Sequence, residues 1–411
     1  MRLFSFLFVF IYVLTTNIGQ RIGIDPKLVT YFLLAYSLLY ITFKGRMKLF
    51  FHTPIALVAL CVVVTILMRL SKGIMANSFL VLMNLMFPAL LLFLFEQIKV
   101  SKLSMVKVLL NIFTLNCCMA IVEFAMKSHF IGWYENAYAD GYVSFNDSVF
   151  RSVALWGGPL TNAELTCIIN GFLLFSSIKK KYKLFFLGTI AILAYNARTS
   201  FFMNAAIFVL YSIINFHSFS NRQKRLLIGA MFLLVVVVSL IVFNTNMGSR
   251  LMMSEKTDGG SIDVRLQLFD YAMTLNYEDF LLGMSYDDFK NLQLAIGVKV
   301  IENFWLNYIF HFGIIVVILF VIAYFFVIKS VFKTYKLSTK LILVLGILII
   351  MSSTNGLYSD YRSFLMLLLC GYIFAPQKNM KNEKLNSKFS KKNESLLGQP
   401  VNVLIRGDGF S

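Results

Sequence analysis

Long runs of apolar residues with almost no charge recur from one end of the 411-residue chain to the other. A transmembrane α-helix needs about 20 such residues. We expect twelve membrane-spanning runs, at approximately 3–18, 28–43, 53–68, 78–95, 105–126, 160–178, 184–197, 200–216, 226–244, 303–328, 341–356 and 362–375. Only 14% of the residues are charged, against about 25% in soluble proteins, which excludes a soluble enzyme. A membrane β-barrel would show short segments of alternating hydrophobicity instead. The sequence therefore predicts an all-α polytopic membrane protein with about 12 transmembrane helices.

The basic residues predict the orientation, because cytoplasmic loops of membrane proteins carry an excess of Lys and Arg. With a cytoplasmic N-terminus, about two thirds of the 38 Lys and Arg residues fall in cytoplasmic loops or in the C-terminal tail. The net charge of +18 is then a topology signal, not a sign of nucleic-acid binding. We expect a polytopic domain over 1–375, cytoplasmic termini, and a basic, disordered cytoplasmic tail over 376–411.

Residues 184–216 admit two interpretations, a single span broken by polar residues or a hairpin of two short helices. A single span would invert every later loop. The cations from Lys329 to Lys340 and the Lys-rich tail would then lie outside, against the rule for cytoplasmic loops. We therefore expect the hairpin.

This topology leaves two long external segments, at about 127–159 and 245–302. Loops of that length in a compact protein usually carry function. In the second segment, acidic residues and glycines predict a helix over 264–275, a stop at Gly283 and another helix near 287–296. The segment should form a small helical cap on the external face.

The 5 cysteines all lie inside apolar runs, and the 4 histidines show no HExxH pairing. This pattern is typical of packing residues, not of disulfides or clustered zinc ligands. We predict no catalytic metal and no cofactor.

Arg198 is expected below the external surface, at the tip of the hairpin. The preceding arm, 184–195, gives about 18 Å of helix, well short of the ~30 Å hydrocarbon core. An arginine at membrane depth is costly to insert and is a functional candidate by default. Its natural ligand is a phosphate held by two hydrogen bonds. The structural alternative is an ion pair with Glu164 or Glu123.

Arg151 precedes the turn at 157–159, Gly-Gly-Pro, which brings a backbone close to a ligand. Upstream aromatic residues, Tyr142 among them, suit stacking on sugar faces. The alternatives are a loop salt bridge for Arg151 and an interfacial aromatic belt for the tyrosine. Further along the chain, Asp360 and Arg362 are expected to pair.

Arg265 shares a face of the expected loop helix with Leu268, Phe269 and Ala272, so it should point toward protein or membrane. An arginine on a buried face needs an anionic partner. Arg250 is a second candidate, with an interfacial anchor as its alternative.

Glu302 opens the run at 303–328 on the expected external side, together with Asn303 and Trp305. A carboxylate partly out of water is a candidate general base. The alternative is an acid that caps the helix start. His311, two turns deeper, is interpreted as a hydrogen-bonded core histidine.

These features together resemble the O-antigen polymerase and O-antigen ligase superfamily of bacterial envelope enzymes, the Wzy and WaaL types. The resemblance covers roughly 140–375 and includes the many-span helical body and the long external loop between late spans. Its short motifs, all on the expected external side, are Arg151 with Gly158-Pro159, Arg198-Thr199-Ser200, Val264-Arg265 through Leu281-Leu282-Gly283, and Glu302-Asn303 followed by Leu306 and Gly313.

The chain departs from the family pattern at three positions. Glu302 stands where the ligases have His, which favours a polymerase. Thr199 stands in place of the usual glycine after the arginine, and Ser285 in place of a frequent second glycine of the loop run.

The resemblance implies a GT-C-like glycosyltransferase that acts on undecaprenyl-pyrophosphate-linked glycans outside the bacterial inner membrane, without a metal. Its general base would be Glu302, and Arg198 and Arg265 would stabilise the leaving pyrophosphate. The implied substrate-binding residues are Arg151, Arg250, Asn303, Trp305 and Tyr142. The implied partners are the lipid-linked donor and acceptor, the lipid bilayer and a membrane protein that regulates chain length.

Other functions stay open at this point. One is an O-antigen ligase that transfers polymer to lipid A-core. Another is a transporter or flippase for the same lipid-linked glycan, which would need charges around a central cavity, whereas the conspicuous charges here collect on one side. A polytopic subunit without chemistry is the third.

Overall fold

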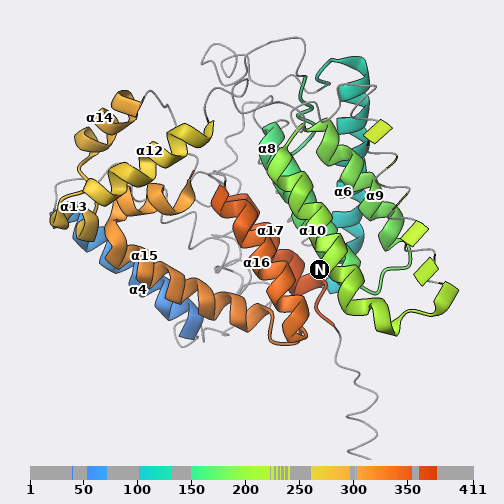
Figure 1. Ribbon diagram of the computed structural model, residues 1–411. Coiled ribbons are helices and arrows are strands. Elements are labelled where there is room, and N and C mark those ends of the chain that lie inside the picture. The colour runs from blue at the N-terminus through green and yellow to red at the C-terminus, as the bar shows by residue number, and fades with distance from the viewer. Residues whose placement is uncertain are drawn as a thin grey trace, which may run out of the picture. The chain divides into compact units, whose positions relative to one another are not determined.

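A computed structural model describes residue 39, residues 53–71, 101–130 and 150–222, parts of 224–240, and residues 261–296, 301, 303–353 and 361–376. Every regular element in these ranges is a helix (Figure 1). The chain divides into a compact unit of Met1–Ala375 and a second unit, Pro376–Ser411. All the helices given below belong to the first unit, and the predicted tail beyond Pro376 lies outside the described residues.

The helices are α4 (Thr53–Ser71), α6 (Lys102–Met126), α8 (Pro159–Phe175), α9 (Lys181–Ala194), α10 (Arg198–Asn215), the short 3₁₀ helix η3 (Phe216–Ser218), α12 (Ser261–Thr274), α13 (Tyr277–Leu282), α14 (Tyr286–Ile296), α15 (Phe304–Val331), α16 (Leu337–Ser353) and α17 (Tyr361–Ile373).

Three helices of the described residues are long and apolar enough to cross a membrane, namely α6, α15, and α10 together with η3. Shorter apolar stretches lie in α16 and α17. The described part of the chain is thus all-helical and has the character of a membrane protein. The predicted runs at 3–18 and 78–95 lie outside the described residues, so the number of twelve spans stays a prediction.

The predicted hairpin is present as α9 and α10, which are separated by Tyr195–Ala197. Asn196 takes a positive φ of 57°, which reverses the chain. Contacts pair early residues of α9 with late residues of α10: Tyr182 with Tyr211, Phe185 with Phe208, and Thr189 with Asn204. From one pair to the next, the residue number in α9 rises while that in α10 falls, so the two helices run antiparallel.

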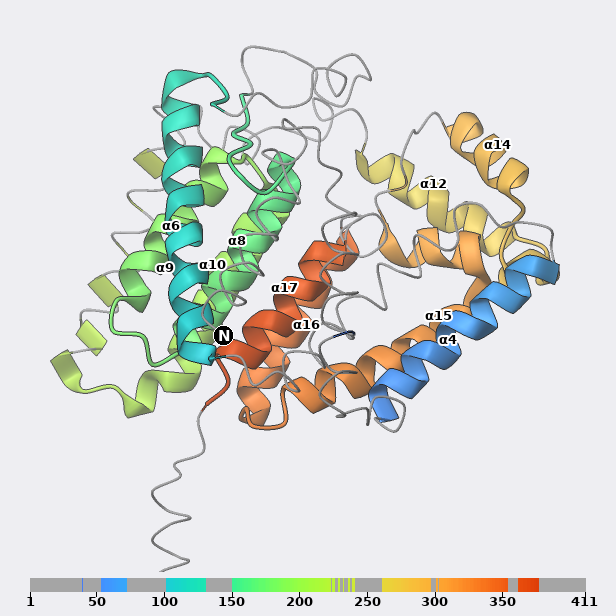
Figure 2. The ribbon, with the colours of Figure 1, turned by 180° about the vertical axis from the view of Figure 1, so that it is seen from behind.

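Helix α8 runs parallel to α10, because Asn170 donates to Asn204 at 3.0 Å and Phe175 contacts Tyr211 further along both helices. These helices pack side by side with α6 and α9 (Figure 2). The amide pair is fully buried between apolar faces. Interhelical hydrogen bonds of this kind hold membrane helices together.

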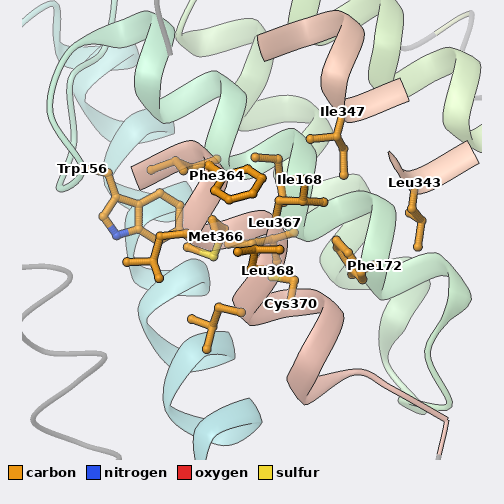
Figure 3. Packing of buried hydrophobic residues seen from close by; sticks show 14 of the residues in the cluster. Trp156, Ile168, Phe172, Leu343, Ile347, Phe364, Met366, Leu367, Leu368 and Cys370 are labelled. Atoms are coloured by element: carbon orange, nitrogen blue, oxygen red, sulfur yellow. The ribbon is translucent and has the colours of Figure 1, made fainter. Parts of the chain in front are cut away.

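Helix α17 also runs parallel to α8, with Arg362 beside Trp156 and Phe374 stacked on Phe172. The core between these helices is filled by buried apolar side chains (Figure 3), among them Ile168 and Phe172 from α8 and Phe364, Leu367 and Cys370 from α17. The N-termini of α8, α10 and α17 therefore lie at one end of the bundle, which we call the loop end. The C-termini of α6 and α9 lie there too, through contacts given below.

Helix α15 contains a sharp break at Gly313, where φ is 75° and ψ is 166°. Phe304 lies 6.0 Å from Phe320 between ring centroids, although 16 residues of straight helix would separate them by about 24 Å. The arm 304–312 therefore folds back on the segment 314–331. The predicted continuous span over 303–328 is wrong in this respect, because a glycine allows a backbone reversal that apolar composition does not reveal.

Helices α12, α13 and α14 form a small cap on the arm of α15. Leu268 of α12 and Phe289 of α14 are buried in one apolar cluster with Phe310 of the arm. Two of the helices, α12 and α14, correspond to the predicted ones, and Gly283 ends α13 as expected. Phe269, which was predicted on the inner face of α12, is instead half exposed.

Candidate functional site

The segment 151–158, here called the buried loop, has no helical structure and connects Phe150 to α8. Side chains of α6 accept hydrogen bonds from its backbone N–H groups. The Glu123 carboxylate accepts from Val153 at 2.8 Å and from Ala154 at 2.9 Å, and Asn116 accepts from Leu155 at 2.8 Å. The loop is thus fastened to the C-terminal half of α6.

Side chains of α8 and α17 bind the remainder of the buried loop. Asn162 accepts from the N–H of Trp156 at 3.2 Å and donates to the carbonyls of Val153 and Gly157 at 2.6 and 2.8 Å. Arg362 donates to the carbonyl of Trp156 at 2.9 Å. Four polar side chains therefore hold the buried loop: Glu123 and Asn116 from α6, Asn162 from α8 and Arg362 from α17.

Non-helical backbone at membrane depth is tolerated only where protein groups or water satisfy its polar atoms. Each unsatisfied group would cost several kcal/mol in hydrocarbon. The residues from Ser152 to Gly157 are buried, and side chains supply the partners that a helix would have supplied internally. These hydrogen bonds hold the backbone of the buried loop in one conformation and thereby fix the position of Arg151 at its start.

The buried loop carries Arg151 to the start of α10, where Arg198 lies. The N–H of Ser152 donates to the carbonyl of Ala194 at 3.1 Å, and the Ser152 hydroxyl donates to Ala120 of α6 at 2.6 Å. Asn116 donates to the hydroxyl of Tyr195 at 2.7 Å. Arg151 therefore precedes Ser152 by one residue, and Arg198 follows Ala194 by four residues. Both arginines are partly buried.

The N-termini of α8 and α10 supply hydrogen-bond donors at the loop end, where the C-termini of α6 and α9 also lie. Neither Gly158, the N-cap of α8, nor Ala197, the N-cap of α10, makes a side-chain capping hydrogen bond. The first N–H groups of a helix lack partners within the helix, and its N-terminus favours a negative charge. The indole N–H of Trp156 is fully buried and has no hydrogen-bond partner among the described residues. The starts of α8 and α10 and the indole N–H of Trp156 therefore offer donors to an anion at the loop end, beside the buried carboxylate of Glu123.

The segment before the buried loop is anchored at the end of α6. His129 stacks on Phe150 with ring centroids 4.8 Å apart, and lies 3.7 Å from the Glu123 carboxylate. The Lys127 ammonium lies 3.6 Å above the ring of Phe124, and its partial burial lowers the pKa of this amine. These contacts fix the start of the loop close to α6.

The other predicted site residues lie in or next to the cap. Arg265 belongs to α12, one turn before the buried Leu268, and its side chain lies outside the described part. Asn303 is the N-cap of α15, where its side chain accepts from the N–H of Leu306 at 3.2 Å. Trp305 packs edge-on against Phe304. The predicted residues Glu302, Arg250 and Tyr142 lie outside the described residues.

A ladder of aromatic rings connects the arm of α15 to the loop end. Phe304 contacts Phe320, Phe320 contacts Tyr324 at 4.0 Å, and Tyr324 contacts Phe364 at 3.9 Å between centroids. Phe364 follows Arg362 by two residues in α17. The motif that begins at Asn303 is therefore linked to the buried loop through packed side chains, although its fold-back was not predicted.

Arg362, Asn116 and Asn162 were not predicted as parts of the site, and Glu123 was considered only as a partner of Arg198. The expected partner of Arg362, Asp360, lies outside the described residues. The sequence does mark these residues, because polar residues within apolar runs are rare and usually have a partner inside the protein. What the sequence does not reveal is which backbone atom each of them binds.

No protein-family model, no curated protein and no solved structure matches this chain.

Proposed function

We propose that this protein is a membrane glycosyltransferase that polymerises undecaprenyl-pyrophosphate-linked oligosaccharide repeat units into O-antigen or capsular polysaccharide. The observation that carries the proposal is the hydrogen bond between Ser152 and Ala194, which brings the loop of Arg151 to the helix start of Arg198. Two of the motifs on which the family resemblance rests are thereby neighbours, at an end of the bundle where helix N-termini favour anions. A lipid-linked pyrophosphate is such an anion.

In the proposed reaction, the oxygen of an acceptor sugar hydroxyl attacks the anomeric carbon of the donor glycan. The bond from that carbon to the pyrophosphate oxygen breaks, and the lipid pyrophosphate leaves with the bonding electrons. Glu302 takes the hydroxyl proton as general base. Arg198 and Arg265 stabilise the charge that develops on the leaving group, since arginine binds phosphate oxygens with two parallel hydrogen bonds.

The remaining predicted residues bind the two glycans in this proposal, namely Arg151, Arg250, Asn303, Trp305 and Tyr142. The loop end faces the outside of the bacterial inner membrane, and both termini lie in the cytoplasm. A chain-length regulator in the same membrane is a proposed protein partner. The twelve predicted spans complete this topology.

Deletion of the gene in its native host, followed by gel analysis of surface glycans, tests the function class. A polymerase predicts glycans that carry a single repeat unit. The absence of any attached O-antigen would identify a ligase instead. Accumulation of the lipid-linked unit on the cytoplasmic side would identify a flippase. An unchanged glycan ladder in the deletion strain would contradict all three.

A further inference from the structure

A groove of about 450 Å³ lies between α15 and α16. Apart from Lys329 and Lys340, every residue that lines it is apolar or aromatic. The groove opens onto the surface of the protein, because Phe325 of α15 and Leu345 of α16 are 59% and 53% exposed. A hydrocarbon chain therefore fits its walls better than water does.

One end of the groove is basic. Lys329 lies in the last turn of α15, and Lys340 lies in the first turn of α16. The connection between these helices carries two further exposed lysines, Lys333 and Lys336. Four cations therefore gather where the apolar walls end. The groove thus complements a lipid, which has an apolar tail and an anionic head.

The basic end is opposite to the loop end. The hydroxyl of Tyr335 donates to the carbonyl of Gly371 at 3.0 Å, near the C-terminus of α17. Arg362 lies at the other end of the same helix, nine residues away, or about 14 Å along its axis. A ligand headgroup at Lys329 and Lys340 would thus be separate from the anion proposed at the arginines.

The depth of the groove matches a single membrane leaflet. Phe320 and Lys329 both line it and are nine residues apart, which is about 14 Å of helix. Half of the hydrocarbon core of a bilayer is about 15 Å. An acyl chain in the groove would therefore place its headgroup at the level of the two lysines, which extend toward the membrane surface.

We propose that this groove is a binding site for an anionic phospholipid. An acyl chain lies along Val321, Phe325 and Leu345, and the phosphate lies between Lys329 and Lys340. Basic pockets between transmembrane helices on the cytoplasmic side recognise anionic headgroups in this manner. The headgroup end of this site, at Lys329 and Lys340, is separate from the arginines of the proposed active site, whereas Trp305, a proposed glycan-binding residue, lines the other end of the groove.

The test measures lipid binding to the full-length protein by native mass spectrometry, comparing phosphatidylglycerol and phosphatidylcholine with identical acyl chains. Each lysine near an anionic headgroup contributes about fivefold in affinity, so two predict a preference of about 25-fold for phosphatidylglycerol. The double variant Lys329→Gln/Lys340→Gln should lose most of that preference, because only Lys333 and Lys336 remain at this end. The control Lys179→Gln/Lys180→Gln removes the same charge from two exposed positions in another connection and should retain it.

A tryptophan at Leu345 tests the apolar part of the groove. Leu345→Trp should weaken the binding of both lipids, because the larger side chain fills the groove from an exposed position. Inorganic phosphate should not compete with phosphatidylglycerol, and competition would reveal a simple anion site and overturn the proposal. Equal binding of both lipids by the wild type, or a preference that persists without the two lysines, would overturn it as well. Absence of bound lipid would likewise overturn it.

Discussion

The backbone at Gly283 crosses the backbone of α15 at Gly313, and neither position has room for a Cβ atom. A Cβ on Gly283 would lie 2.7 Å from the carbonyl carbon of His311, and a Cβ on Gly313 would overlap the carbonyl of Leu281. The N–H of Met284 donates to the carbonyl of Phe310 at 2.7 Å beside the crossing. The cap is therefore joined to the membrane domain at the break of α15.

Gly313→Ala should destabilise the protein. The residue has a φ of 75°, and a strained backbone of this kind costs about 1–3 kcal/mol in a residue other than glycine, before the overlap with Leu281 is added. A lower midpoint of thermal unfolding in detergent would show the effect. The control is Gly229→Ala, whose added Cβ meets no atom of the described residues within 4 Å. Equal midpoints for the two variants would contradict the crossing.

Glu123→Gln should loosen the buried loop. The carboxylate accepts from the N–H groups of Val153, Ala154 and Phe130, and an amide has one acceptor oxygen instead of two. A buried donor left without an acceptor costs about 1–3 kcal/mol. The measurement is the unfolding midpoint, with Glu278→Gln on the exposed surface of α13 as the matched change. A Glu123→Gln protein as stable as that control would show that the hydrogen bonds contribute little.

Arg198→Ala and Arg265→Ala should each reduce glycan chain growth by about 100- to 1000-fold, the usual effect of removing one donor to a developing charge. Protein level should persist. Lysine should restore part of the activity, since it supplies the charge without the planar fork. Arg222→Ala, an exposed arginine beyond the end of α10, serves as the control. Full activity of an alanine variant would remove that arginine from the site, and loss of the protein would support a structural ion pair.

Glu302→Gln should shorten the glycan to one or a few repeats, because general base catalysis contributes about 10²–10⁴-fold. Glu302→Asp should be milder. If Glu302 only caps a helix, both variants should be near neutral, since dipole and capping effects are about 0.3–1 kcal/mol. Glycan length on gels separates the two roles. A wild-type ladder in Glu302→Gln would rule out this base and leave His311 or Asp360 as candidates, or a reaction without a protein base.

Cysteines introduced near positions 140 and 275 should react with an impermeant reagent from outside the cell. Those near 180, 222, 335 and 390 should react only after permeabilisation. The background for this labelling needs the 5 native cysteines replaced, because Cys118 is exposed. External labelling at 335 would contradict the predicted topology and the external position of the loop end.

Local patterns predicted the elements that depend on neighbouring residues. The hairpin of α9 and α10 followed from charge balance and from polar residues near Asn196, and α14 followed from acids before an amphipathic stretch. The break at Gly313 was not predicted, because the run around it is apolar on both sides. Its conformation depends on α13, about 30 residues earlier, and periodicity within one element carries no information on such a crossing.

The partners of the candidate site could not be predicted for a similar reason. Arg362 and Trp156 are 206 positions apart in sequence, and Asn116 and Tyr195 are 79 apart. The sequence identifies these as polar or bulky residues in apolar surroundings. Only the fold determines that they meet at one loop.

The buried loop also determines where this chain can accept extra residues. Segments without secondary structure usually tolerate insertions, because their backbone is exposed and bonded to water. Here each backbone N–H from Val153 to Leu155 donates to a side chain of α6, and the carbonyl of Val153 accepts from Asn162 of α8. One inserted residue would shift every later group away from its partner, as a register slip does in a sheet. This coil should therefore be as intolerant of length changes as the interior of a helix.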